Sequence, residues 1–173
     1  KGRTTNTGAK EIIKYASEIQ TEIKMGNKDV ILPIIAYYGT GRLWMQKKDR
    51  NLKKIQESFS RLKGYVDCID SASNEKMMLK WLEKMTYLEL QEGKRIPELS
   101  VVKNALSQSY MAIDETIKTA EFNFKVRSGE LEVAIRRENG VVENLPLRIL
   151  SDGIKSTLSM IADIAYRMAI FVS

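Results

Sequence analysis

Apolar residues recur at every third or fourth position in four stretches of the chain, the spacing that places them on one face of an α-helix. The sequence therefore predicts helices over residues 9–25, 74–91, 99–117 and about 152–170. A weaker stripe of the same kind covers residues 46–63.

The first and last of these helices carry further signals. Gly26 and Asn27 follow the first helix, and both residue types favour the backbone conformation that ends a helix. In the last helix we expect one apolar face to point inward. Its members are Ile154, Leu158, Ile161, Ala162, Ala165, Met168 and Ala169.

A different pattern covers Val30–Tyr38, where the chain is apolar throughout and shows no alternation. Such a run is typical of a strand buried on both faces, as in a parallel sheet. Pro33 has no N–H to give to a ladder, so we expect regular pairing only over Ile34–Tyr38. Gly39 and Gly41 are expected to end this strand in a loop.

A third pattern, alternation of apolar and polar residues, predicts short strands late in the chain. The apolar positions are Phe122, Phe124, Val126, Leu131, Val133 and Ile135. Ser128-Gly129 and Asn139-Gly140 are turn pairs, so we predict an antiparallel meander that reaches into residues 141–150. The fold class expected is mixed α/β (α+β), with a helical insert at about 46–119 and a small antiparallel meander.

Composition narrows the classes of site that the chain can hold. It has no histidine and one cysteine, Cys68, which removes a Ser-His-Asp triad and a cysteine/histidine zinc site, so no metal site is expected. The lone cysteine fits a reducing compartment, and we expect a cytoplasmic protein. The net charge of +6 permits binding to polyanions. No apolar run approaches the ~20 residues of a membrane span, so no membrane contact and no signal peptide are expected.

The turn at 150–153, Leu-Ser-Asp-Gly, opens the last predicted helix. Ser151 is a good N-cap, and Gly153 lets another group approach the backbone closely. A helix N-terminus favours phosphate, and Lys155 or Arg148 would add a cation. From these residues alone, a capped surface helix is the commoner alternative.

The segment that contains this turn, LPLRILSDGIKSTLSMIADIAYRMA, resembles the signature segment of ABC-type ATPases. It is most similar to bacterial AAA-type ATP-binding proteins related to the overcoming-lysogenisation-defect and chromosome-maintenance ATPases. LPIIAYYGTGRLW resembles this family's strand between the P-loop and the signature, and GRTTNTGAKEIIKYA resembles the stretch before that strand.

The resemblance implies a partial P-loop NTPase head of the ABC type. In that superfamily the signature turn caps the γ-phosphate of ATP held by the opposite subunit. The residues that would do so here are Leu150, Ser151, Asp152, Gly153 and Lys155. Asp152 departs from the glycine of the common signature, and Ile154 from its frequent glutamine, which leaves the direct-contact role of Asp152 open.

The chain has no Walker A sequence, and no strand ending in Asp-Glu follows residue 170. We therefore expect an internal segment of such an ATPase, inactive alone. The parts implied are 1–45 in the ATPase core with the buried strand, 46–120 as a lid-like helical insert, and 121–173 with the meander and signature helix. The intact protein would bind ATP and Mg²⁺ between two heads of a homodimer. Relatives act on DNA or in phage defence, often with a nuclease partner.

Two further groups of residues are candidates for binding. The loop after the predicted strand would lie near the nucleotide, and its members are Tyr38, Gly39, Thr40, Gly41 and Arg42. Alternatively, this is a core strand with a tight turn. A basic stretch could bind nucleic acid through Lys47, Lys48, Lys53 and Lys54, although a solvated helix face is the commoner use of such a charge run.

The alternative function is a non-enzymatic one. A basic helical domain of this composition could serve as an interaction module that binds protein or nucleic acid while only keeping an ATPase-like shape. A Walker A sequence encoded immediately upstream would distinguish the ATPase from this module.

Overall fold

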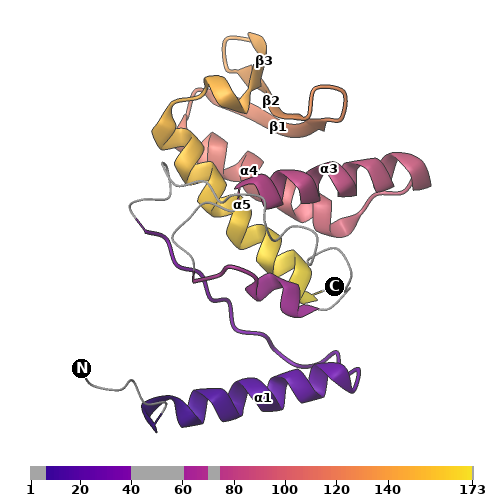
Figure 1. The fold of residues 1–173 in the computed structure, drawn as a ribbon. Coiled ribbons are helices and arrows are strands. Elements are labelled where there is room, and N and C mark those ends of the chain that lie inside the picture. The colour runs from indigo at the N-terminus through magenta and orange to yellow at the C-terminus, as the bar shows by residue number, and fades with distance from the viewer. Residues whose placement is uncertain (1–6, 40–60, 70–74, 173) are drawn as a thin grey trace. The chain divides into compact units, whose positions relative to one another are not determined.

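The computed structural model describes residues 7–39, 61–69 and 75–172, and the chain divides into two compact units after Pro33. In the first unit, η1 (Thr7–Ala9) leads into α1 (Lys10–Lys24) (Figure 1). The predicted end of this helix is confirmed: Gly26 has a φ of 84°, and its N–H donates to the carbonyl of Ile23 at 3.0 Å. The predicted apolar stripe forms, but no residue of α1 is buried.

The second unit contains the remaining described elements. Its helices are η3 (Arg61–Tyr65), α3 (Glu75–Glu92), α4 (Pro97–Ile113), η4 (Leu147–Ile149) and α5 (Asp152–Val172). Its strands are β1 (Ile117–Lys125), β2 (Glu130–Arg137) and β3 (Val142–Pro146), which form an antiparallel sheet in the order β1-β2-β3. The mixed α/β fold class and the helices predicted over 74–91 and from about 152 are confirmed.

The antiparallel meander is also confirmed, with its register set by the turns that the sequence indicates. Gly129 and Gly140 adopt φ values of 69° and 83°, which glycine reaches without steric cost. Alternate residues then face one side, so that Phe122 lies opposite Val133 and both are fully buried. Val126 falls beyond the end of β1 and is exposed.

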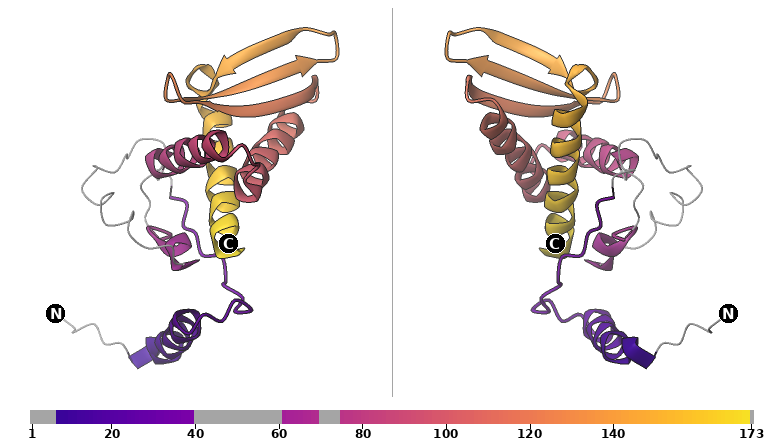
Figure 2. Two further views of the ribbon diagram at one scale, coloured as in Figure 1. Left: turned by 90° about the vertical axis from the view of Figure 1, so that its right-hand side faces the viewer. Right: turned by 90° about the vertical axis from the view of Figure 1, so that its left-hand side faces the viewer.

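The core of the second unit lies between this sheet and the helices α3, α4 and α5, with α4 and α5 contributing most of the helical residues. Figure 2 shows the three strands above α4 and the N-terminal part of α5. The helices contribute Leu99, Val102, Leu106, Tyr110, Leu158, Ala162, Ala165 and Ala169 to one buried cluster with the strands. Residues of the predicted insert at 46–120 and of the predicted C-terminal part at 121–173 therefore share one hydrophobic core.

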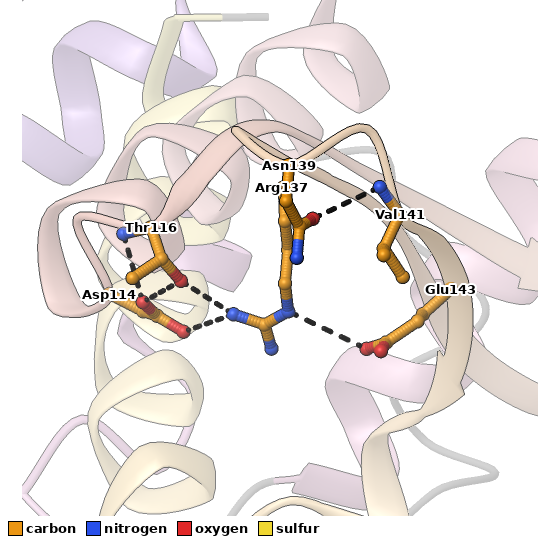
Figure 3. Close-up of polar contacts among 6 residues, drawn as sticks. All are labelled: Asp114, Thr116, Arg137, Asn139, Val141 and Glu143. Carbon is orange, nitrogen blue, oxygen red and sulfur yellow. Dashed lines mark hydrogen bonds and ion pairs between the residues drawn. The ribbon is translucent and has the colours of Figure 1, made fainter.

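The predicted helix over 99–117 is too long at its C-terminal end. α4 ends at Ile113 because the donors of Thr116 bond to the Asp114 side chain instead of continuing the helix. The Asp114 carboxylate accepts hydrogen bonds from the N–H of Thr116 at 3.1 Å and from its hydroxyl at 2.7 Å (Figure 3). Such a local turn competes with the helix. Ile117, predicted as the last helical position, instead begins β1 and is buried there.

The predicted strand over Ile34–Tyr38 is wrong within the described residues. This stretch has no regular secondary structure, and Ile34, Ile35 and Tyr37 are each more than 40% exposed. One backbone hydrogen bond joins it to a distant segment, from the Tyr37 N–H to the carbonyl of Cys68 at 2.7 Å. The described sheet is entirely antiparallel and pairs no strand with this run, so its apolar composition alone does not make it a strand.

Candidate functional site

The turn at 150–153, which leads into α5, is anchored in the core by its first residue, Leu150. β3 ends at Pro146, η4 follows, and Leu150 then turns inward and is 9% exposed, as a member of the core cluster. Its N–H donates to the carbonyl of Leu147 at 3.2 Å. The residues that follow, Ser151 to Gly153, are exposed. Leu150 thus anchors a turn whose polar residues face solvent.

Ser151 caps α5, as its sequence position predicts. Its hydroxyl oxygen accepts from the N–H of Ile154 at 3.4 Å, and its carbonyl accepts from the N–H of Lys155 at 2.9 Å. The other amides of the first turn point out of the helix end, where its dipole is positive. A Cβ added at Gly153 would meet nothing within 4 Å, so packing within the described residues does not require glycine there.

The charges around the turn are paired. The Lys155 ammonium lies 2.8 Å from a carboxylate oxygen of Asp152, one turn apart on the same helix. The Arg148 guanidinium donates to the Glu130 carboxylate at 2.9 Å. Both cations line a hollow of about 140 Å³ beside the turn, with Leu79 and Leu131 among its apolar walls. The two predicted helper cations therefore lie near one another, and each already has an acidic partner.

The second candidate group begins at Tyr38, which contacts α5 at a point distant from the turn. The Tyr38 hydroxyl donates to a carboxylate oxygen of Asp163 at 3.0 Å. Asp163 is twelve positions after Ser151, roughly 18 Å along a helix that rises 1.5 Å per residue. The structure therefore does not bring Tyr38 and Ser151 together within one chain. Gly39 is half-buried, and Thr40, Gly41 and Arg42 lie outside the described residues.

A buried ion pair at this point was missed by the helical-face prediction. Asp163 and Arg167 are 5% and 2% exposed, and the guanidinium donates to the carboxylate at 3.0 Å. Arg167 also donates to the carbonyls of Gly64 and Val66, at 2.5 and 3.2 Å. Met168, predicted to face inward, is 48% exposed instead, because Arg167 occupies the buried position beside it. The sequence signal for this ion pair was an acid and a base four positions apart on an otherwise apolar helix face.

One more predicted group, the lysines of the basic stretch, falls outside the described residues. Lys47, Lys48, Lys53 and Lys54 lie outside them. Within them, no group of three or more acidic or cysteine side chains is arranged to hold a metal ion, and no helix is long and apolar enough to cross a membrane. The donor set at the start of α5, amides with one hydroxyl, fits an oxyanion such as a phosphate rather than a cation.

No protein-family model matches the chain, and no curated protein is significantly similar to it.

Proposed function

We propose that this chain is an internal segment of an ABC/AAA-type P-loop ATPase, in which the turn at 150–153 caps the γ-phosphate of ATP bound by the opposite head. The observation that carries the proposal is the exposed, capped N-terminus of α5, anchored by buried Leu150. Such a site needs a turn that is rigidly held on its inner side and open on its outer side. The intact protein would act as a homodimer of heads in the cytoplasm.

Each residue of the turn has a distinct role in this proposal. Ser151 donates its hydroxyl to the phosphate, and Gly153 offers its N–H without a side chain in the way. The open space around Gly153 supports this role, because the fold itself leaves that position free for a larger residue. ATP with Mg²⁺ supplies the phosphate, and the groups that would hold the metal are not among the residues described above.

Asp152 fits the proposal through its ion pair. A free carboxylate beside a γ-phosphate would be repulsive, but the Lys155 ammonium at 2.8 Å compensates this charge. Asp152 is therefore proposed to hold Lys155 at the helix end, and Lys155 to be the cation that the phosphate meets. DNA processing or phage defence with a nuclease partner is the role that the resemblance implies for the whole assembly.

The test is the Ser151→Arg substitution in the intact protein. A bulky side chain at the cap would occupy the place of the phosphate, so ATP-driven pairing of heads and ATP hydrolysis should both be lost. Binding of the first ATP should persist, because the P-loop lies elsewhere. Light scattering in the presence of ATP measures pairing, and phosphate release measures turnover.

Two controls separate this role from simple helix capping. Ser151→Ala should cost about 1 kcal/mol of capping and reduce activity only in part. Ser17→Arg makes the same change on the exposed face of α1 and should leave pairing and turnover unchanged. If Ser151→Arg pairs and hydrolyses like the parent, the turn is a helix cap and the assignment is wrong.

A further inference from the structure

A groove of about 640 Å³ lies between α4 and β1 and shares no lining residue with the hollow beside α5. One wall is the α4 surface around Lys103, Ser107 and Gln108. The other wall consists of the consecutive residues from Lys118 to Asn123. Because neighbouring residues of a strand point to opposite faces, a wall that includes every one of them is the strand's edge.

This edge is unpaired in the part of the chain that the structure describes. β1 pairs with β2 on one side only, as the first strand in the order β1-β2-β3. An edge strand directs every second N–H and C=O away from its neighbour. The bulge that protects many edges is confined here to Ile117–Thr119, so the pairing from Ala120 to Lys125 is regular. The groove thus offers a row of backbone donors and acceptors.

The charged groups of the groove favour an acidic occupant. Its lining includes three cationic side chains, Arg95, Lys103 and Lys118. None of them forms an ion pair with another of the described residues. Of the two acids present, Glu89 already accepts from the N–H of Ile96 at 3.0 Å. Three cations against two carboxylates, Glu89 and Glu121, leave the groove with a net positive charge.

We propose that β1 binds an extended acidic segment of a partner protein, which adds to the sheet as a further strand and directs carboxylates toward α4. A peptide backbone matches both the donors and the acceptors of the edge, whereas a nucleic-acid backbone has no N–H groups to pair with the carbonyls of β1. A second copy of this chain fits less well, because pairing β1 with β1 would bring the same three cations together.

The probe is a fluorescent peptide of about eight residues in which glutamate and threonine alternate, since threonine favours strands and glutamate supplies the charge. It should bind the 173-residue chain, and NMR should show shifted amide signals over residues 119–124. The same peptide methylated at every second backbone nitrogen should not bind, because it loses the N–H groups that pair with β1. Equal binding of the methylated peptide would overturn strand addition.

Paired protein variants test the charge argument. Arg95→Glu combined with Lys103→Glu should weaken binding about tenfold or more. Lys94→Glu combined with Lys80→Glu makes the same change of net charge at exposed positions that do not line the groove, and should change affinity less than about twofold. Thermal melting verifies that both proteins fold. Equal weakening by the two pairs would refute the groove as the binding site.

Two further results would also overturn the proposal. One is the absence of peptide binding by the folded parent chain. The other is stronger binding of a single-stranded oligonucleotide that shifts the same amide signals, which would assign the groove to nucleic acid.

Discussion

Among the residues that the structure describes, Arg167 is the largest fully buried side chain, and it joins α5 to the segment 61–69. From α5 it donates to Asp163 on the same helix and to the carbonyls of Gly64 and Val66. Burying a cation costs desolvation free energy, even when it has several acceptors. Replacing Arg167 by an uncharged residue nevertheless costs more, because it leaves the Asp163 carboxylate in the core without a counter-ion. Arg167 therefore helps to hold the segment 61–69 against α5, together with the contact between Tyr65 and Phe171.

Removing this cation should be more harmful than removing the whole pair. Arg167→Met should lower the free energy of unfolding by about 3 to 5 kcal/mol, because Asp163 loses its buried counter-ion and two carbonyls lose the Arg167 donor. Arg167→Met combined with Asp163→Leu should be less destabilised than Arg167→Met alone, because no charge then stays buried. Urea unfolding followed by circular dichroism measures both.

Arg127→Met, in the exposed turn after β1, is the matched control and should change stability by less than about 0.5 kcal/mol. A double variant as unstable as the sum of its single changes would show that the two side chains do not act as a pair.

At the scale of elements, the junction of α4 and β1 depends on one carboxylate. Hydrogen bonds from Thr116, and then from Arg137, hold the pKa of Asp114 below its ordinary value of 3.8. Arg137 reaches from β2 to donate to Asp114 at 3.0 Å and lies 3.8 Å from Glu143 on β3 (Figure 3). The cluster thus connects the end of α4, and the turn that leads into β1, to strands β2 and β3.

The lowered pKa gives this junction a defined dependence on pH. A carboxyl whose native pKa is depressed stabilises the fold above its unfolded pKa, and this contribution disappears as pH falls through the native value. Thr116→Val removes the hydroxyl donor and should raise the pKa of Asp114. The stability difference between parent and variant should therefore be largest near neutral pH and narrow in acid.

Urea unfolding at a series of pH values measures this difference, and NMR of the Asp114 carboxyl carbon follows its titration directly. Thr119→Val on the exposed side of β1 is the control, and any change in stability that it causes should not vary with acid pH. An unshifted Asp114 titration in Thr116→Val would contradict the role given to the hydroxyl.

At the scale of the whole molecule, the shared core of α3, α5 and the sheet suppresses ionisation of a tyrosine. Burial, more than any charge nearby, raises the pKa of Tyr166 to about 12. Tyr166 is 4% exposed and meets the Trp81 ring edge-on, with 5.1 Å between ring centroids. The neutral phenol is thus the form that the folded protein accommodates.

This shift predicts a loss of stability at alkaline pH. The unfolded phenol ionises at its ordinary pKa of 10.0, so the stabilisation is fully present below pH 10 and is lost as pH rises through about 12. The total loss is about 2 to 3 kcal/mol, from 1.36 kcal/mol per pKa unit. Tyr166→Phe should lose less stability across this range, as measured by urea unfolding.

Tyr87→Phe is the matched control, because Tyr87 is 52% exposed on α3, and its alkaline stability profile should follow the parent. Identical profiles for Tyr166→Phe and the parent would show that another group governs alkaline unfolding.

Features that depend on neighbouring residues alone are read correctly from the sequence. The serine cap of α5, the glycine that ends α1 and the two glycine turns of the meander all appear where the sequence predicts them. The Asp152–Lys155 ion pair was not predicted, although a spacing of three along a helix allows it. The roles proposed for this turn in phosphate binding stay predictions.

Features that depend on a partner distant in sequence were decided only by the tertiary structure. An apolar run becomes a strand when another strand offers its hydrogen bonds, and none among the described residues pairs with Ile34–Tyr38. Arg167 is buried because carbonyls about one hundred positions away accept from it. The groove along β1 exists because α4 crosses beside an unpaired edge. Periodicity along the chain determined the helices and the meander, whereas pairing between distant segments determined the buried charges, the missing strand and the open edge.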